Sequence, residues 1–244
     1  MSDSLKAFYD DRKNSLASLE QDALLRKTGQ DFVERSIPHK YTFNFDWMGR
    51  PIIQHAEDIL AMQEIIFRMQ PDLIVETGVA HGGSSVFYAS MCRLMGKGHV
   101  VGIDIDIRPH NRLALEEHPM YEHITLIEGS STDLSVVNQV TAMAKDKRVL
   151  VILDSNHTHD HVLQELRLYS PLTHKDDYLV VFDTIVENLP DALVNDRPWG
   201  KGDNPMTAVK QFLKENGRFE VDREMEAKLI ISMAPHGYLR CLKD

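Results

Sequence analysis

The stretch Leu73-Ile-Val-Glu-Thr-Gly-Val-Ala-His-Gly-Gly-Ser84 decides the fold class. It opens with a short apolar run of the kind that fills a buried parallel strand. Gly78 and the pair Gly82-Gly83 follow, and glycine lets the backbone approach a ligand closely before it turns into a helix. The spacing differs from the dinucleotide fingerprint, and no Gly-Lys-Ser/Thr of a P-loop is present. The stretch therefore predicts a strand, a ligand-binding loop and a helix, in that order.

The same alternation of strand, loop and helix continues toward the C-terminus. Apolar runs predict four further strands, with helices between them, at residues 99–105, 124–128, 149–154 and 178–183. Such alternation implies right-handed crossovers and a doubly wound parallel sheet. Beyond residue 204 the pattern predicts one helix at 205–215 and strands at 219–221, 229–233 and 238–242. We expect an α/β, Rossmann-like fold with a mostly parallel seven-stranded sheet and an antiparallel C-terminal strand.

The N-terminal part of the chain has a different pattern. Residues 1–35 are polar with apolar side chains at helical spacing, and residues 36–55 are rich in turn formers. We therefore predict an N-terminal helical extension with an irregular segment over 1–55, and a Rossmann-like domain over 56–244. The additional helices favour a homo-oligomer. The segment 187–204 is long for a loop, and we expect either a lid over the site or a disordered connection.

Composition excludes several classes of partner. The formal net charge of −10 argues against nucleic acid, because phosphate contacts need clustered Lys and Arg side chains. No apolar run approaches the roughly 20 residues that span a bilayer, so no membrane span is expected. The N-terminus lacks the pattern of a secretory signal. Cys92 and Cys241 are too few and too distant for a disulfide framework, and a cytoplasmic location is expected.

Polar side chains end all five predicted parallel strands, where ligands bind in open α/β sheets. They are Glu76, Asp104, Glu128 with Ser130, Asp154 and Asp183. A carboxylate at the position of Glu76 disfavours a phosphate ligand and suits the cationic end of S-adenosylmethionine. Asp104 follows 28 positions later, where a carboxylate accepts ribose hydroxyls in dinucleotide folds. The predicted cofactor site comprises Glu76, Gly78, His81, Ser84, Asp104, Ser130 and Asp154.

The ends of the fourth and fifth strands suggest a metal and a base. Asp154 and Asp183 are carboxylates at neighbouring strand ends and could chelate a hard cation such as Mg²⁺. His157, three residues after Asp154, is the candidate general base. The run from His157 to His161 partly matches a binuclear zinc motif, but it is one residue short. We therefore expect His159 and His161 to face solvent.

Several motifs together resemble the family named for cephalosporin hydroxylase and rhamnosyl O-methyltransferase. The resemblance covers roughly residues 40–242 and rests on Leu73–Ser84, Val101-Gly-Ile-Asp104, Leu153-Asp-Ser-Asn-His157, Tyr178-Leu-Val-Val-Phe-Asp-Thr184, Trp47-Met-Gly-Arg-Pro-Ile-Ile-Gln54 and Pro235-His-Gly-Tyr-Leu-Arg240. It implies a Rossmann-like methyltransferase that uses S-adenosylmethionine to methylate a hydroxyl group of a sugar or sugar-containing metabolite. The small-molecule partner is then a sugar or a sugar nucleotide.

The resemblance also implies roles for single residues. Relatives hold Mg²⁺ with an aspartate after the fourth strand and a Glu-Asp pair after the fifth, and the histidine acts as base. Asp154, His157 and Asp183 match this pattern, whereas Phe182 stands in place of the glutamate. Glu187 or Asn156 is a candidate for the missing ligand.

Three residues before the Rossmann-like domain are candidates for contact with the acceptor. Trp47, Arg50 and Gln54 are expected to line the acceptor pocket, although Trp47 is equally expected in the core.

Two alternative functions differ from methyl transfer. One alternative is an oxidative enzyme of antibiotic biosynthesis, whose only support is the histidine-rich turn. The other is a non-catalytic accessory protein with the same fold. The acceptor and the methylated hydroxyl are not encoded in any recognisable motif.

Overall fold

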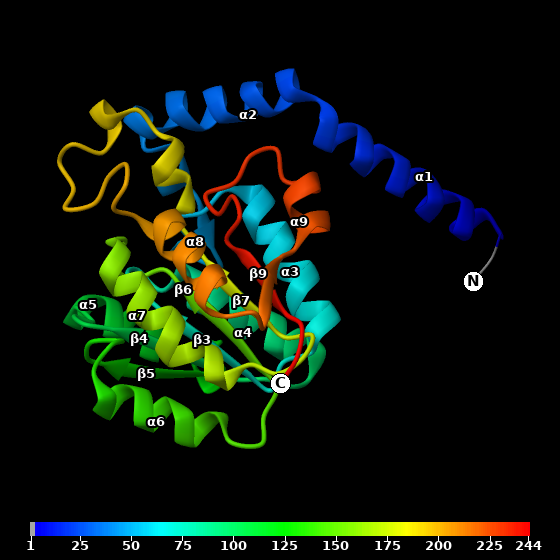
Figure 1. The fold of residues 1–244 in the computed structure, drawn as a ribbon. Helices are drawn as coiled ribbons and strands as arrows, with labels where there is room; N and C mark the ends of the chain where they lie inside the picture. Colours follow the sequence, from blue (N-terminus) through cyan, green and yellow to red (C-terminus); the bar gives the residue numbers. More distant parts are fainter. Residues whose placement is uncertain (1–2) are drawn as a thin grey trace.

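Five apolar segments form the parallel part of a central sheet in the computed structural model, which describes residues 3–244 (Figure 1). The sheet has seven strands in the order β5-β4-β3-β6-β7-β9-β8. Their bounds are β3 (Leu73–Thr77), β4 (Val100–Asp104), β5 (Ile124–Glu128), β6 (Val149–Leu153), β7 (Tyr178–Val181), β8 (Phe219–Val221) and β9 (Tyr238–Cys241). β9 is antiparallel to both of its neighbours. The expected sheet, with its antiparallel C-terminal strand, is confirmed.

Helices cover both faces of this sheet, so β3, β4, β6 and β7 are buried along almost their whole length, whereas the edge strand β5 is partly exposed. One core lies between the sheet and α3 (Ala56–Met69), α4 (Gly83–Met95) and α5 (Pro109–Glu116). The other core lies between the sheet and α6 (Leu134–Ala144), α7 (His159–Tyr169) and α8 (Pro205–Glu215). Burial on both faces explains why the strands are continuous apolar runs in the sequence.

The N-terminal residues form two helices, as expected, followed by a short irregular stretch. α1 (Asp3–Gln21) and α2 (Ala23–Ser36) are separated at Asp22, whose side chain caps α2 by accepting the Leu25 amide at 2.9 Å. Residues 37–55 contain the 3-10 turns η1 (Ile37–His39) and η2 (Tyr41–Asn44) and a small hairpin of β1 (Asp46–Trp47) and β2 (Arg50–Pro51). The division of the chain at residue 55 stays a prediction.

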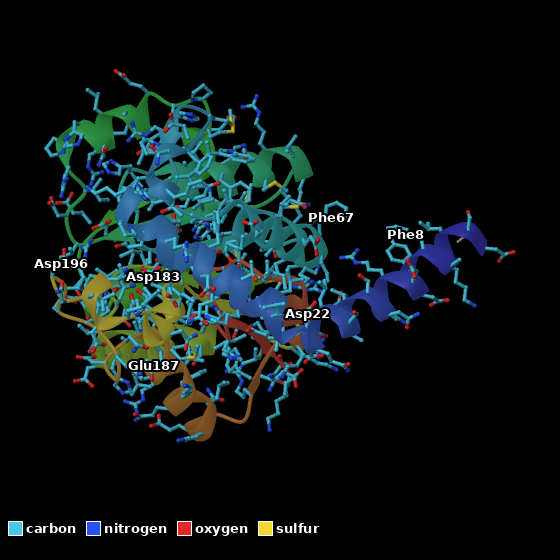
Figure 2. All side chains as sticks on the ribbon, turned by 90° about the horizontal axis from the view of Figure 1, so that it is seen from above. Phe8, Asp22, Phe67, Asp183, Glu187 and Asp196 are labelled. Carbon is cyan, nitrogen blue, oxygen red and sulfur yellow. The ribbon has the colours of Figure 1, made fainter. Side chains whose placement is uncertain are left out.

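The two N-terminal helices differ in their contact with the rest of the molecule. α2 lies over the body: Val33 packs with Ile185, Val186, Leu189 and Val194. α1 has no buried residue and projects outward as an arm (Figures 1 and 2). Phe8 lies on the projecting part of the arm, and Asp22 marks its junction with the body in Figure 2.

The expected strand at 229–233 is wrong. Residues 229–233 form a loop after the helix α9 (Arg223–Lys228), which is capped by Asp222 accepting the amides of Glu224 and Met225 at 3.0 and 3.1 Å. The following loop satisfies its polar groups on a side chain: buried Asp58 accepts the Ser232 hydroxyl at 2.6 Å and the Met233 amide at 2.8 Å. Hydrogen bonds to one carboxylate thus replace those of a strand.

The strand order reverses beside β3, which pairs with β4 on one side and β6 on the other. Ligands of open α/β sheets bind outside the carboxyl ends of the strands at such a switch point. The loops after β3, β4, β6 and β7 all meet at this edge. Within residues 3–244, no helix is long and apolar enough to cross a membrane.

Candidate active site

A cavity of about 450 Å³ opens at the carboxyl ends of β3, β6 and β7. Its floor consists of the loops after these strands, including Gly78, Ser84, Asp154, His157 and Asp183. Its walls come from elsewhere in the chain. One wall is formed by residues 36–37, 40–43 and 53–55. The other wall is formed by residues of the segment 186–199, which contains the 3-10 turn η6 (Asp191–Leu193). The site therefore joins the sheet edge to two peripheral segments.

The loop after β3 fits its position only because it begins with glycine. Gly78 has φ of +89°, in the left-handed region, and a Cβ atom there would lie 2.0 Å from the Asp154 carbonyl oxygen. The amide of Gly78 donates to the Ile103 carbonyl at 2.8 Å. The loop is therefore packed against the backbone that carries Asp154, and neither can shift alone.

Side chains hold this loop from both sides. Asp104 Oδ2 accepts the amides of Val79 and Ala80 at 2.9 and 3.0 Å. Arg50 donates to the His81 carbonyl at 2.9 and 2.6 Å and to Asn111 at 3.0 Å. Asp104 and Arg50, both predicted to bind ligands, thus form hydrogen bonds that hold the loop itself. His81 and Ser84 line the cavity.

Glu76 lies beneath the loop instead of on the cavity surface. Its side chain is 1% exposed, and its carboxylate accepts a hydrogen bond from Ser85. Burial raises the pKa of Glu76 to about 7, with hydrogen bonds from Ser84 and Ser85 acting in the opposite direction and Asp104 adding repulsion. A carboxyl group so placed can respond to a cation above it, because its charge changes near neutral pH.

Asp154, His157 and Asp183 come together at the cavity floor. One potential ligand atom from each lies within 4.8 Å of the others. His157 Nε2 is 3.2 Å from Asp183 Oδ2, and the imidazole packs nearly perpendicular to the Trp199 ring, with ring centroids 4.8 Å apart. A carboxylate at that distance stabilises the positive charge that the imidazole ring acquires with a proton.

The two aspartates repel one another. Burial raises the pKa of Asp154 well above its usual range, and the charge of Asp183 raises it further. Paired carboxylate oxygens at neighbouring strand ends are the donors that Mg²⁺ prefers, and a divalent cation would relieve this repulsion. The residues present therefore fit such an ion.

Glu187 and Asn156, the two candidates to supply a third oxygen ligand to the metal, already hydrogen-bond other groups of the protein. Glu187 accepts the Gly202 amide at 2.9 Å and the Asn204 side chain at 2.6 Å, so it fastens the 200–204 loop. Asn156 Oδ1 accepts both the amide and the hydroxyl of Thr158 at 2.9 Å. Phe182, at the position where the resemblance implies a glutamate, is buried in the core.

The other predicted ligand-binding residues are divided between the core and the cavity. Trp47 donates to Ser90 at 3.1 Å and packs edge-on against Phe87, so it belongs to the core. Gln54 lines the cavity and is 4% exposed. Ser130 lies outside the cavity lining, 3.0 Å from the Thr132 hydroxyl.

His159 and His161, expected to face solvent, are half-buried, and each ring also contacts polar groups of the protein. The His159 ring contacts Thr207 at 2.8 Å and Gln211 at 3.1 Å, which ties α7 to α8. His161 Nε2 lies 3.1 Å from the Ser131 hydroxyl and 3.4 Å from the buried Glu165 carboxylate. Neither ring is in the cavity, and both bind polar groups of neighbouring segments.

Much of the cavity wall consists of residues that no sequence motif identifies. Tyr41 and His55 line the cavity from the N-terminal side, and Leu189, Val194 and Arg197 line it from the opposite side. The segment 187–204, expected as a lid or a disordered connection, packs along this wall with Trp199 against His157. The only signal in the sequence was the enrichment of aromatic residues between 32 and 47.

Comparison with known proteins identifies sequence relatives. The family model "Rhamnosyl O-methyltransferase/CmcI" matches residues 39–242. A protein named rhamnosyl O-methyltransferase from Mycobacterium bovis (strain BCG / Pasteur 1173P2) is 31% identical over 211 residues, which is 82% of each chain. Its counterpart from Mycobacterium leprae (strain TN) is 31% identical over 196 residues, covering 79% of this chain and 81% of the relative.

Solved structures share the fold. A CmcI structure described as containing Mg and SAM superposes with a TM-score of 0.57 at 20% identity, covering 82% of this chain and 77% of CmcI. A CmcI structure with SAH gives a TM-score of 0.55 at 20% identity, covering 81% and 82%. At this identity the likeness concerns the fold: the Rossmann-like methyltransferase architecture is present here.

Proposed function

The chain belongs to the Rhamnosyl O-methyltransferase/CmcI family, and we propose that it transfers the methyl group of S-adenosylmethionine to a hydroxyl group of a sugar-containing acceptor. One observation carries the proposal. Asp154, His157 and Asp183 meet beside the Gly78 loop in a single cavity, so a cofactor loop and a proton-accepting group share one site. The methyltransferase names of the relatives favour this reaction over an oxidative one.

The cofactor end of the site is the loop after β3. S-adenosylmethionine, when bound, supplies an activated methyl group on a positively charged sulfur. We assign its binding to Glu76, Gly78, His81, Ser84, Asp104, Ser130 and Asp154. The loop's fixed backbone and the negative charge available from Glu76 support this assignment. Calorimetry with S-adenosylmethionine tests it without any acceptor, and a protein that binds none at millimolar concentration contradicts the proposed function.

The proton-accepting group in the proposal is His157. Its ring takes the proton of the acceptor hydroxyl as general base, and Asp183 at 3.2 Å stabilises the resulting imidazolium. Packing against Trp199 further restricts the ring. Asp154 and Asp183 orient the acceptor oxygen, so that a large part of the rate acceleration comes from alignment. Transfer of labelled methyl groups to 4-nitrophenyl α-L-rhamnopyranoside is the direct assay, because the relatives are named as rhamnosyl methyltransferases.

We expect Mg²⁺ to be required. Asp154 and Asp183 would hold it, and when bound it would lower the pKa of a coordinated hydroxyl. Treatment with EDTA should reduce methyl transfer at least about tenfold, and added Mg²⁺ should restore it. Addition of Mg²⁺ should also raise the melting temperature of the wild-type protein but not that of Asp183→Asn. Full activity after complete chelation would exclude the metal role.

The projecting helix α1 supports self-association. Its apolar side chains Leu5, Phe8, Tyr9, Leu16 and Leu19 share one stripe at helical spacing, and Phe8 is 61% exposed. A helix of this length gains little stability on its own in water, so an arm with such a stripe needs a partner. Leu60 and Phe67 on α3 are each 64% exposed, near the Arg12–Glu64 ion pair at the root of the arm. We propose a homo-oligomer in which α1 covers this α3 surface of a second copy.

Phe8→Glu should weaken this association by at least about tenfold, because burial of one aromatic side chain contributes about 1.5–3 kcal/mol. Asn14→Glu is the matched control, since it places the same charge on the same helix but off the apolar stripe. Analytical ultracentrifugation over a concentration series measures both. A wild-type protein that is monomeric at all concentrations, or equal behaviour of the two variants, contradicts the oligomer.

A cytoplasmic location is also part of the proposal. Cys92 and Cys241 are both buried and both free thiols. Free thiols suit a reducing compartment.

A further inference from the structure

His55 is the second histidine of the cavity, and the mechanism above does not use it. It lines the cavity from the N-terminal wall and is only 1% exposed. Among residues 3–244, the His55 ring has no hydrogen-bond partner: its contacts are the aromatic rings of Tyr41, at 6.0 Å and nearly parallel, and Phe32, at 6.2 Å. A buried polar ring without a partner requires an explanation.

Structural roles do not explain the polar ring. His55 is the N-cap residue of α3, where a side chain often accepts a helix amide, but its side chain makes no capping hydrogen bond. Its packing against Tyr41 and Phe32 requires only an aromatic ring, and a ring without nitrogen atoms would serve equally well. Burial lowers the pKa of His55, with Glu57 and Asp183 acting in the opposite direction. The neutral ring offers one donor and one acceptor.

The neighbouring residue, Gln54, is also buried against the cavity. Its amide lies within hydrogen-bonding reach of the buried Tyr88 hydroxyl, so Gln54 has a partner inside the protein. Leaving a buried polar group unsatisfied costs stability unless a ligand completes it. The unpartnered His55 ring therefore marks a polar ligand contact at this wall.

The cavity neighbours of His55 indicate which part of the ligand it meets. His55 lines the same cavity as His157 and Asp183, whose side chains lie 3.2 Å from each other. In the proposed mechanism these two residues meet the acceptor hydroxyl, so His55 lines the cavity that receives the acceptor. We propose that His55 hydrogen-bonds a second oxygen of the acceptor, next to the hydroxyl that is methylated, and so selects which hydroxyl reaches His157. This inference rests on the proposed function.

The test compares His55→Phe with wild-type protein, because phenylalanine keeps the packing against Tyr41 and Phe32 and removes both nitrogens. The probes are 4-nitrophenyl α-L-rhamnopyranoside and its monodeoxy derivatives. For wild-type protein, kcat/KM should be about tenfold lower with one monodeoxy derivative that keeps the methylated hydroxyl than with the parent rhamnoside. For His55→Phe, kcat/KM with the parent rhamnoside should be about tenfold lower than for wild type. For that derivative, kcat/KM should be the same in His55→Phe as in wild type. The Kd for S-adenosylmethionine should change less than about twofold.

Controls separate this inference from the proposed function. His39→Phe makes the same replacement at an exposed position of the same segment and should keep wild-type values. His55→Asn, which retains a donor and an acceptor, should recover part of the discrimination. Unchanged discrimination in His55→Phe, while wild-type protein methylates the rhamnoside, overturns the inference alone. A wild-type protein that binds S-adenosylmethionine but uses no rhamnoside also overturns it, and one that binds no S-adenosylmethionine contradicts the proposed function.

Discussion

Replacing His157 with alanine should lower kcat for methyl transfer by about 10²- to 10⁴-fold, the range typical of a positioned general base. The ring contacts both Asp183 and Trp199, which fix its orientation toward the cavity. Binding of S-adenosylmethionine should be retained, because the loop after β3 does not depend on this ring. Steady-state kinetics with a saturating rhamnoside, together with calorimetry for the cofactor, measures both effects.

His159→Ala is the matched control for this variant. His159 lies two residues further along, but its ring contacts Thr207 and Gln211 outside the cavity. Its loss should reduce stability by about 1 kcal/mol and leave kcat within about twofold of wild type. A His157→Ala enzyme with a kcat within threefold of wild type would remove His157 as the base.

The second large effect is expected at Gly78. Gly78→Ala forces a side chain into the left-handed region, at about 1–2 kcal/mol, and places its Cβ 2.0 Å from the Asp154 carbonyl oxygen. Backbone cannot yield as a flexible side chain does, so overpacking adds about 1–3 kcal/mol. We expect a loss of about 3 kcal/mol in the free energy of unfolding and loss of cofactor binding, measured by denaturant titration and calorimetry.

Gly96→Ala isolates the conformational part of this effect. Gly96 also has a positive φ, +70°, but a Cβ atom there would meet nothing within 4 Å. This variant should lose only about 1–2 kcal/mol and bind the cofactor normally. Equal losses in the two variants would show that the contact between Gly78 and the Asp154 backbone is unimportant.

The parallel part of the fold was predictable because its determinants are local. Strands buried on both faces are apolar runs, and glycine and polar residues mark their ends. The clustering of Asp154, His157 and Asp183 was predictable as well, because the carboxyl ends of neighbouring parallel strands meet at one edge of the sheet. The strand expected at 229–233 failed because long-range hydrogen bonds to Asp58 stabilise a loop there. A pairing over more than 170 residues leaves no local signal.

The cavity walls were not predictable for a related reason. His55, Tyr41 and Arg197 come from segments without regular periodicity, and their positions depend on tertiary packing. Trp47 and Arg50 have the residue types of a ligand pocket, yet they hold Ser90 and the His81 carbonyl instead. Residue type alone cannot distinguish a side chain that binds a ligand from one that supports the loop beside it.

The construction of the cavity from a sheet-edge floor and two peripheral walls has an evolutionary consequence. Substitutions in 36–43 or 186–199 change the shape presented to the acceptor, and most of these residues lie outside the two main cores that stabilise the sheet. The exposed members of these segments tolerate replacement at little cost in stability, whereas Val186, Leu189 and Val194 pack with Val33 in a smaller core. A lineage can therefore acquire new acceptors by drift in two short segments while the methyl-donor loop stays constant. Exchanging these two segments between relatives is accordingly a practical way to engineer acceptor range.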